Sequence, residues 1–381
     1  MKKVFKYLPL LAITPMMLSS CKSYLSFITS KRDGMRITDV QYAYLTNNNP
    51  ADTTPYNGNM SVGAPNPIRL KWNAKGIKRY KVTIASDPDF RNIEAVYKTN
   101  KTHLDFYNDK FNTKYFWKVE GVDKPGASRT DVFEYAPTVT QPRNLYVDGV
   151  ENIRDIGGWV KIDDSGVTRY MKQGMIYRSG RFNEYDDENE KSVNTITKKG
   201  LNEVKSHLKF KTEIDLRRSS TNETGGITSS VLGDDVNYVN LPMYYGGQNI
   251  LTYTGKPSGD DYQYNNPLMI KQFFELLEDS RNYPINFHCS IGKDRTGCLA
   301  YLIEGLMGFD QEIMYRDYMF TNFSNAGMCK LQDDVLSSSR YGYTLANYEG
   351  DTISEKVYNY LNNVIGLTTT QLNRIINILR N

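Results

Sequence analysis

The chain has 381 residues, with 47 Lys and Arg against 43 Asp and Glu, so its formal net charge is +4. This near balance excludes the dense basic surface that is typical of nucleic-acid-binding proteins. Four cysteines exclude an extensive framework of disulfides. The length favours about two domains.

A short basic and apolar segment opens the sequence. Basic residues within 1–6 precede a mostly apolar run at 7–18, and Leu-Ser-Ser-Cys follows at 18–21. The run is shorter than the roughly 20 apolar residues that span a bilayer. It is typical of a secretory signal, and its end resembles a bacterial lipobox. The resemblance implies a signal peptide at 1–20, a lipid on Cys21 and, because Lys22 is not the retaining Asp, attachment to an outer membrane, on its periplasmic or surface face. An ordinary cleaved signal is the alternative.

Residues 21–34 have no strong periodicity and are expected to form a tether. From 35 to 137 apolar and polar residues alternate in short runs, as at 68–72, 80–84 and 115–119, with turn residues between them. This pattern predicts an all-β sandwich, and its strands resemble those of fibronectin type III modules. Its tryptophans are interpreted as core residues. The resemblance implies that this domain could bind a protein or a glycan, and the choice between them stays open.

Strands and helices alternate after a proline-containing linker at 138–144. Strand or strand-and-turn segments are predicted at 152–158, 211–216, 237–242 and 284–288, and helices at 193–208, 267–279, 311–322, 354–365 and 369–380. This order predicts an α/β domain at 145–381, with a mostly parallel sheet flanked by helices. The run 244–266, rich in Gly, Tyr, Asn and Asp, is expected to be an irregular loop near the site.

The segment 288–297 reads His-Cys-Ser-Ile-Gly-Lys-Asp-Arg-Thr-Gly and joins a predicted strand to a predicted helix. A cysteine after a strand, followed by five residues and an arginine at a helix start, can hold a phosphate dianion over a thiolate. The backbone N–H groups and the helix N-terminus supply an anion site, and the same dipoles favour the thiolate. The expected phosphate-binding residues are Ser290, Ile291, Gly292, Lys293, Asp294 and Arg295.

These ten residues resemble the signature loop of the cysteine-dependent protein tyrosine phosphatase superfamily. Their Gly-Lys-Asp-Arg-Thr-Gly ending resembles an atypical bacterial branch related to dual- and triple-specificity phosphatases, which accept phosphotyrosine and often phosphoinositides. Blocks at 152–158, 176–180 and 214–217 resemble other blocks of that branch in the same order. The resemblance covers about 145–381 and implies a cysteine-phosphatase fold without a cofactor. A buried cysteine and a surface arginine on an ordinary turn is the alternative.

The resemblance implies that Cys289 is the nucleophile and that Arg295 clamps the phosphate. Thr296 would stabilise the thiolate as it leaves, and His288 would orient the loop. No metal is expected, because the three histidines of the chain are scattered without metal-ligand spacing. Cys298 is interpreted as a core residue.

The general acid that protonates the leaving group stays open. Asp294 is the first candidate, and bracing Arg295 or the loop is its alternative role. Asp215, in the block at 214–217, is the second candidate. Asp260 and Asp261 precede the cysteine at about the distance of a mobile-loop acid, but no surrounding motif supports them.

The leading hypothesis is a lipid-anchored phosphatase, outside the cytoplasm, for phosphotyrosine or related phosphomonoesters. A phosphoinositide or inositol-polyphosphate phosphatase is the close alternative. Lys293 bears on this choice, because it could bind a second phosphate or could instead pair with a neighbouring carboxylate. A surface adhesion or scaffold protein with an inactive phosphatase domain is the alternative from another class.

Overall fold

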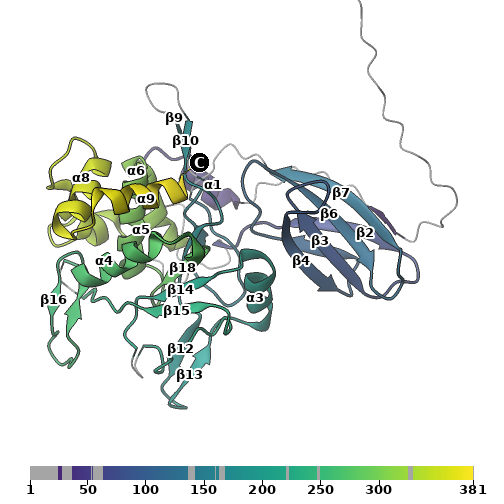
Figure 1. Ribbon diagram of the computed structural model, residues 1–381, viewed down its shortest axis with the longest axis horizontal. Coiled ribbons are helices and arrows are strands. Elements are labelled where there is room, and N and C mark those ends of the chain that lie inside the picture. The colour runs from purple at the N-terminus through teal and green to yellow at the C-terminus, as the bar shows by residue number, and fades with distance from the viewer. Residues whose placement is uncertain are drawn as a thin grey trace, which may run out of the picture.

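The computed structural model describes residues 25–27, 37–52, 54, 63–135, 142–158, 160–162, 168–219, 223–246, 249–324 and 329–380. Cys21 and the predicted signal peptide lie outside these residues. The described chain forms a part built of strands, here called the β region, beside a larger part with helices and strands, here called the α/β region (Figure 1). Within the described ranges, every helix is too short or too polar to cross a bilayer.

The β region contains two antiparallel sheets. One has the order β1-β2-β5 and the other the order β4-β3-β6-β7. Their strands are β1 (Leu25–Phe27), β2 (Ile68–Ala74), β3 (Tyr80–Ala85), β4 (Ile93–Thr99), β5 (His103–Phe106), β6 (Thr113–Gly121) and β7 (Ser128–Tyr135). The predicted alternation is confirmed, because every second side chain of β2 and β6 points into a shared apolar core.

Aromatic rings join the two sheets of the β region. The ring of Trp72 on β2 lies 5.3 Å from that of Tyr80 on β3 and 6.2 Å from that of Trp117 on β6. Both tryptophans are buried, as the sequence indicated. The β region is therefore built of strands, as predicted. That it is a separate domain, and that it is of the fibronectin type III kind, stay predictions.

Two boundaries predicted near the N-terminus were wrong. The tether at 21–34 includes β1, which pairs antiparallel with β2 from Leu25 opposite Ala74. The range 35–137 begins too early for the sandwich, because helix α1 (Asp39–Leu45) packs on the α/β region. Tyr44 of α1 contacts the rings of Phe320 and Phe323. This apolar contact holds α1 on the α/β region, although α1 is closer in sequence to the strands of the β region.

The α/β region is built on a five-stranded sheet with the order β15-β14-β18-β11-β8. These strands are β8 (Arg154–Asp155), β11 (Ile176–Ser179), β14 (Thr212–Asp215), β15 (Asn237–Asn240) and β18 (Ile285–His288). Three of the four pairings are parallel, and β8 pairs antiparallel with β11 at the edge. The mostly parallel sheet is confirmed.

Helices cover both faces of this sheet (Figure 1). The α-helices of the region are α3 (Lys198–Glu203), α4 (Asn266–Leu277), α5 (Asp294–Met307), α6 (Gln311–Met319), α7 (Tyr341–Ala346), α8 (Ile353–Asn359) and α9 (Thr369–Leu379). The single turns are η1 (Val204–Leu208), η2 (Ser280–Asn282), η3 (Phe320–Phe323), η4 (Gln332–Leu336) and η5 (Tyr360–Val364). One core lies between the sheet and α4, α5 and α9, and a second, smaller core lies under η1 on the other face.

The remaining strands form small hairpins at the surface. They are β9 (Val160–Ile162) with β10 (Thr168–Tyr170), β12 (Asn183–Asp186) with β13 (Lys191–Asn194), and β16 (Thr254–Gly255) with β17 (Tyr264–Asn265). The helix predicted at 193–208 therefore starts later, at Lys198, because 193 and 194 pair with β12. The loop predicted at 244–266 carries the β16–β17 hairpin, and its last residue begins α4.

Candidate active site

The segment singled out in the sequence joins the central strand β18 to the buried helix α5. Cys289 follows the strand directly, and Asp294 is the first residue of the helix. The turn between them is tight at Gly292, where φ is +72°. A Cβ at this position would lie 2.6 Å from the Ser179 carbonyl oxygen, so only glycine fits both the conformation and the space.

The carbonyl groups of the loop are held on its outer side. The Ser290 carbonyl accepts from the Arg181 backbone N–H at 3.1 Å. The Ile291 carbonyl accepts from Asn152 Nδ2 at 3.0 Å, and the Gly292 carbonyl from Arg178 Nη2 at 2.7 Å.

The peptide plane fixes where the N–H groups of this loop point. In a trans peptide the N–H is directed opposite to the carbonyl. Three successive N–H groups, those of residues 291 to 293, are therefore turned away from the three bonded carbonyls. Successive N–H groups on one side of a turn form an anion-binding concavity, and the N-terminus of the fourteen-residue helix α5 adds positive potential.

Cys289 and Arg295 are brought together at this concavity, and both are 3% exposed. Burial alone would lower the pKa of Arg295, but the Cys289 sulfur and then Glu223 raise that pKa above its ordinary value. Arg295 Nη2 donates to Glu223 Oε1 at 2.8 Å. The ring of Tyr245 lies 4.5 Å from the guanidinium carbon, at cation–π distance.

Two residues of this cluster were missed in the sequence, because they lie in loops without a recognisable motif. Glu223 fixes the guanidinium from one side and also accepts from the Arg218 backbone N–H at 2.5 Å. Tyr245 is 47% exposed and covers the guanidinium from the solvent side. Neither the spacing nor the composition of the chain indicated that these residues meet Arg295.

A buried ion network braces the loop from beneath. Asp317 accepts from Arg154 Nε at 2.8 Å and, through its other oxygen, from Arg178 Nη1. Burial opposes ionisation, but Arg154 and Arg178 together lower the pKa of Asp317 below its ordinary value. Glu304 lies beside Asp317, and burial followed by this like charge raises its pKa well above the ordinary value. The network therefore holds one carboxylate charge between two guanidinium groups.

His288 lies at the end of β18 and is fully buried. Its Nε2 lies 2.9 Å from Glu213 Oε1, and its Nδ1 lies 3.2 Å from the Cys289 carbonyl oxygen. This placement fits the predicted role of orienting the loop. Glu213, Asp215 and His288 form a compact group of metal-ligand type, but Glu213 also bonds the Ser230 hydroxyl and Asp215 is engaged by Arg217.

Asp215 is placed differently from what an acid catalyst requires. Its carboxylate accepts from Arg217 Nη2 at 2.7 Å and from the Tyr238 hydroxyl at 3.2 Å. Burial opposes ionisation, but His288 and then Arg217 lower the pKa of Asp215. A carboxyl group that stays ionised has no proton to donate, so this geometry argues for a structural ion pair.

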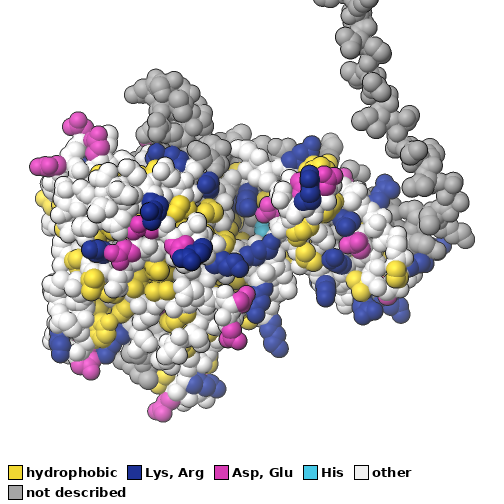
Figure 2. All heavy atoms as spheres, viewed as in Figure 1, with side chains coloured by type: hydrophobic (Ala, Val, Ile, Leu, Met, Phe, Trp, Pro, Cys, Tyr) yellow, Lys and Arg dark blue, Asp and Glu magenta, His cyan; other side chains and the backbone are white. Residues whose placement is uncertain are grey.

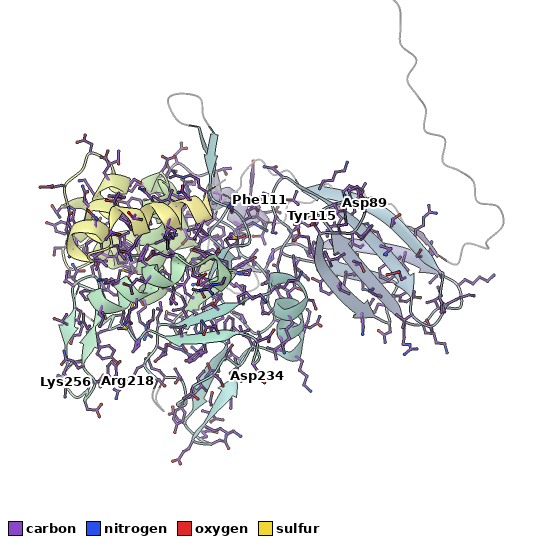
Figure 3. All side chains as sticks on the ribbon, viewed as in Figure 1. Asp89, Phe111, Tyr115, Arg218, Asp234 and Lys256 are labelled. Atoms are coloured by element: carbon purple, nitrogen blue, oxygen red, sulfur yellow. The ribbon has the colours of Figure 1, made fainter. Side chains whose placement is uncertain are left out.

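Asp260 and Asp261 both pair with Arg218, which Figure 3 shows near the β16–β17 hairpin. A hydrogen bond from the Tyr262 backbone N–H is the largest cause that lowers the pKa of Asp260. An ionised carboxylate that is already paired is a poor acid. These two residues fix the hairpin to the loop after β14.

Asp294 differs from the other candidates. Burial is the largest cause that raises its pKa, Asp334 adds to the effect, and Lys293 opposes it. The alternative role of Asp294 was to brace Arg295 or the loop. In this structure the carboxylate that pairs with Arg295 belongs to Glu223. A carboxyl group with a raised pKa at the loop retains a proton at higher pH, as a general acid must.

Lys293 and Thr296 complete the segment. Lys293 Nζ lies 3.2 Å from Asp334 Oδ2, which is the pairing with a neighbouring carboxylate that the sequence left open. The Thr296 hydroxyl is buried and, among the described residues, has no hydrogen-bond partner. Cys298 is fully buried in the core, as the sequence indicated.

A cysteine, a turned set of backbone N–H groups and a buried arginine define a site for phosphoryl transfer through sulfur. The model of a family described as "Tyrosine phosphatase family" matches residues 145–381. The chain therefore belongs to the tyrosine phosphatase family, and it is a cysteine-based phosphatase.

Two solved structures are similar to part of this chain. The core catalytic domain of the PP-IP phosphatase SIW14 from S. cerevisiae is 16% identical over 52% of this chain and 88% of that chain, with a TM-score of 0.30. TpbA from P. aeruginosa is 16% identical over 44% of this chain and 81% of that chain, with a TM-score of 0.26. No curated protein matches the chain.

Asp317→Asn tests the buried network. The change leaves Arg154 and Arg178 without the carboxylate they share, and breaking a buried ion pair costs about 3–5 kcal/mol. We expect the free energy of unfolding in urea to fall by that amount. We also expect phosphatase activity to fall, because Arg178 no longer holds the Gly292 carbonyl. The control Glu349→Gln, at an exposed position, should change stability by less than about 0.5 kcal/mol. Equal stability of Asp317→Asn and wild type would contradict the network.

Proposed function

We propose that this phosphatase hydrolyses phosphotyrosine or related phosphomonoesters by two displacements at Cys289. The outward hydrogen bonds of the carbonyls at 290–292 carry the proposal. They leave the loop N–H groups free to bind the three equatorial oxygens of a phosphoryl group. Arg295 supplies the positive charge that this group needs as it moves between oxygen and sulfur.

In the first displacement, the Cys289 sulfur attacks phosphorus and the bond to the leaving oxygen breaks. The leaving oxygen takes a proton from the general acid, and a cysteinyl phosphate forms. In the second displacement, water attacks phosphorus and gives a proton back to the ionised general acid, the phosphorus–sulfur bond breaks, and phosphate and the thiolate are released. The Thr296 hydroxyl, which has no hydrogen-bond partner among the described residues, is available to donate to that thiolate.

Phosphotyrosine is the substrate that the entrance favours. The partly exposed ring of Tyr245 lies beside Arg295, where it can pack against the phenyl ring of a substrate. Lys293 is engaged by Asp334, so its charge is already compensated. A loop lysine that was free to bind a second phosphate would instead favour phosphoinositides or inositol polyphosphates.

The lipid anchor at Cys21 and the resulting outer-membrane location are also proposed, with support from the apolar run at 7–18 and the Leu-Ser-Ser-Cys sequence that follows it. The scaffold alternative is weaker than the enzyme. An inactive domain would not need the proposed nucleophile, the arginine and the hydrogen-bonded loop to be kept together at one site.

Cys289→Ser tests the nucleophile. A serine hydroxyl is far less ionised than a thiol near neutral pH, so we expect turnover of a phosphotyrosine peptide to be lost while the folded state remains. Activity and thermal unfolding are measured together. Cys298→Ala, at a buried cysteine in helix α5, should retain turnover. Phosphatase activity that survives Cys289→Ser would overturn the proposed mechanism.

Asp294→Asn tests the general acid through the pH dependence of kcat. Because the pKa of Asp294 is raised, its proton persists to higher pH, and wild-type kcat should fall as pH rises through that pKa. The variant should lose about 10²- to 10⁴-fold in kcat and also lose this alkaline fall.

A second variant checks this assignment. Asp334→Asn removes a negative charge that raises the pKa of Asp294, so its alkaline fall should shift to lower pH. If Asp294→Asn lowers kcat but keeps the wild-type pH profile, Asp294 supports the loop and another group is the acid.

Lys293→Ala separates the two substrate classes. Because Asp334 already compensates Lys293, we expect kcat/KM to change by a similar factor on a phosphotyrosine peptide and on a phosphoinositide. A further loss of more than about fivefold on the phosphoinositide alone corresponds to about 1 kcal/mol. That outcome would favour the phosphoinositide alternative.

A further inference from the structure

A cavity lies at the end of the sheet opposite to Cys289. Its volume is about 240 Å³, far above the roughly 30 Å³ of one water in the liquid. Lys211 and Pro284 line it, and they immediately precede β14 and β18, whereas Cys289 follows β18. Glu94 and Lys110 of the β region form the facing wall. The cavity therefore lies where the β region meets the amino ends of the parallel strands.

Arg143 lines this cavity and is only 3% exposed. Its guanidinium carbon lies 4.2 Å from the ring centre of Phe111, which Figure 3 shows at the junction of the two regions. Its Nε is buried without a hydrogen-bond partner, and no carboxylate of the described residues lies within 4.0 Å of the guanidinium. A buried charge without a counter-ion in direct contact is unfavourable by several kcal/mol. The cavity is the adjacent space in which a counter-ion can lie.

The other charges around the cavity add to this imbalance. Its cations are Lys110, Arg143, Lys209 and Lys211, and its acids are Glu94 and Asp155. Glu94 is already paired with Lys110 at 3.2 Å.

Asp155 compensates only part of the remaining positive charge. It accepts the backbone N–H groups of Gly157 at 2.9 Å and Gly174 at 2.7 Å. Burial raises the pKa of Asp155 to about 6 although Arg143 lowers it, so Asp155 is largely ionised at pH 7 and offsets one of the three remaining cations, Arg143, Lys209 and Lys211. Lys and Arg side chains also gather on the surface over the junction (Figure 2).

We propose that this cavity binds a small oxyanion of the phosphate class, at a site separate from the loop at 289–295, and that the anion joins the β region to the α/β region. Arg143 provides the buried charge, and Lys211 and Lys209 provide cations at the rim. This site does not depend on the proposed substrate of the phosphatase.

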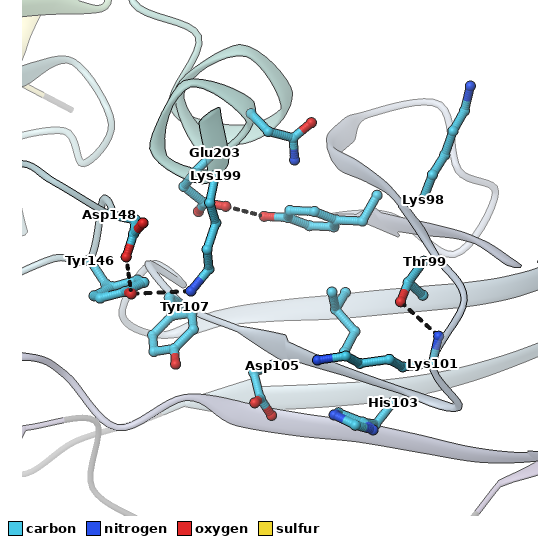
Figure 4. A pocket seen from close by; sticks show the side chains of 13 residues that line it. Lys98, Thr99, Lys101, His103, Asp105, Tyr107, Tyr146, Asp148, Lys199 and Glu203 are labelled. Carbon is cyan, nitrogen blue, oxygen red and sulfur yellow. Dashed lines mark hydrogen bonds between the residues drawn. The ribbon is translucent and has the colours of Figure 1, made fainter. Parts of the chain in front are cut away.

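The hollow in Figure 4 lacks these features, although its volume is larger, about 290 Å³. Its lysines Lys98, Lys101 and Lys199 are exposed. Its carboxylates are bonded within the protein: Tyr97 donates to Glu203 at 2.9 Å and Tyr146 donates to Asp148 at 2.8 Å. The hollow therefore provides a control position rather than a second candidate.

The test uses the full chain carrying Arg295→Met, which weakens phosphate binding at the catalytic loop. Its thermal unfolding temperature is measured against inorganic phosphate, and in parallel against glycerol 3-phosphate, at constant ionic strength maintained with NaCl. We expect a saturable rise with at least one of them, because an anion that binds only the folded state stabilises it. The better ligand then distinguishes a free ion from a phosphate ester.

Two further changes in the Arg295→Met chain locate the anion. Lys211→Gln, at an exposed rim position, should weaken the apparent affinity at least about fivefold without unfolding the protein. Arg143→Gln should abolish the rise. Lys98→Gln, an exposed lysine of the other hollow, should leave the affinity unchanged. The proposal is overturned if neither phosphate nor glycerol 3-phosphate acts more than NaCl, if Lys211→Gln binds like its parent, or if Lys98→Gln weakens binding instead.

Discussion

The hydrogen bond from the buried Arg178 to the Gly292 carbonyl is the contact on which the catalytic loop depends. It turns one peptide plane outward, and Asn152 and the Arg181 backbone do the same for the two planes before it. Arg178 can remain charged in the interior because it shares the carboxylate of Asp317 with Arg154. This ion network contains no nucleophile, and it shapes the proposed phosphate site only through the loop that it holds.

The same network explains why blocks far apart in the sequence accompany the loop. The block at 152–158 supplies Asn152 and Arg154, and the block at 176–180 supplies Arg178 and the close approach of Ser179 to Gly292. The third block, at 214–217, makes its own buried ion pair, which borders His288. These residues position the loop, and none of them needs to touch phosphate.

Both ends of the sheet carry positive charge, for different reasons. At the carboxyl end, Arg295 is held by Glu223 and covered by Tyr245, so its guanidinium is ordered before a substrate arrives. At the amino end, Arg143 is enclosed where the β region meets the strands. The β region also bonds the α/β region directly, through Asn108 with Glu203 at 2.8 Å.

The sequence by itself determined the strand–loop–helix order, the cysteine and arginine at a fixed spacing, and the alternation that builds the β region. These properties are local, because they follow from periodicity and from a continuous motif. Only the tertiary structure decided that Glu223 and Tyr245 meet Arg295, that α1 packs on the α/β region, and which aspartates are ionised in buried pairs. Those outcomes depend on contacts between distant segments and on burial, which sets the balance between desolvation and ion pairing for each carboxylate.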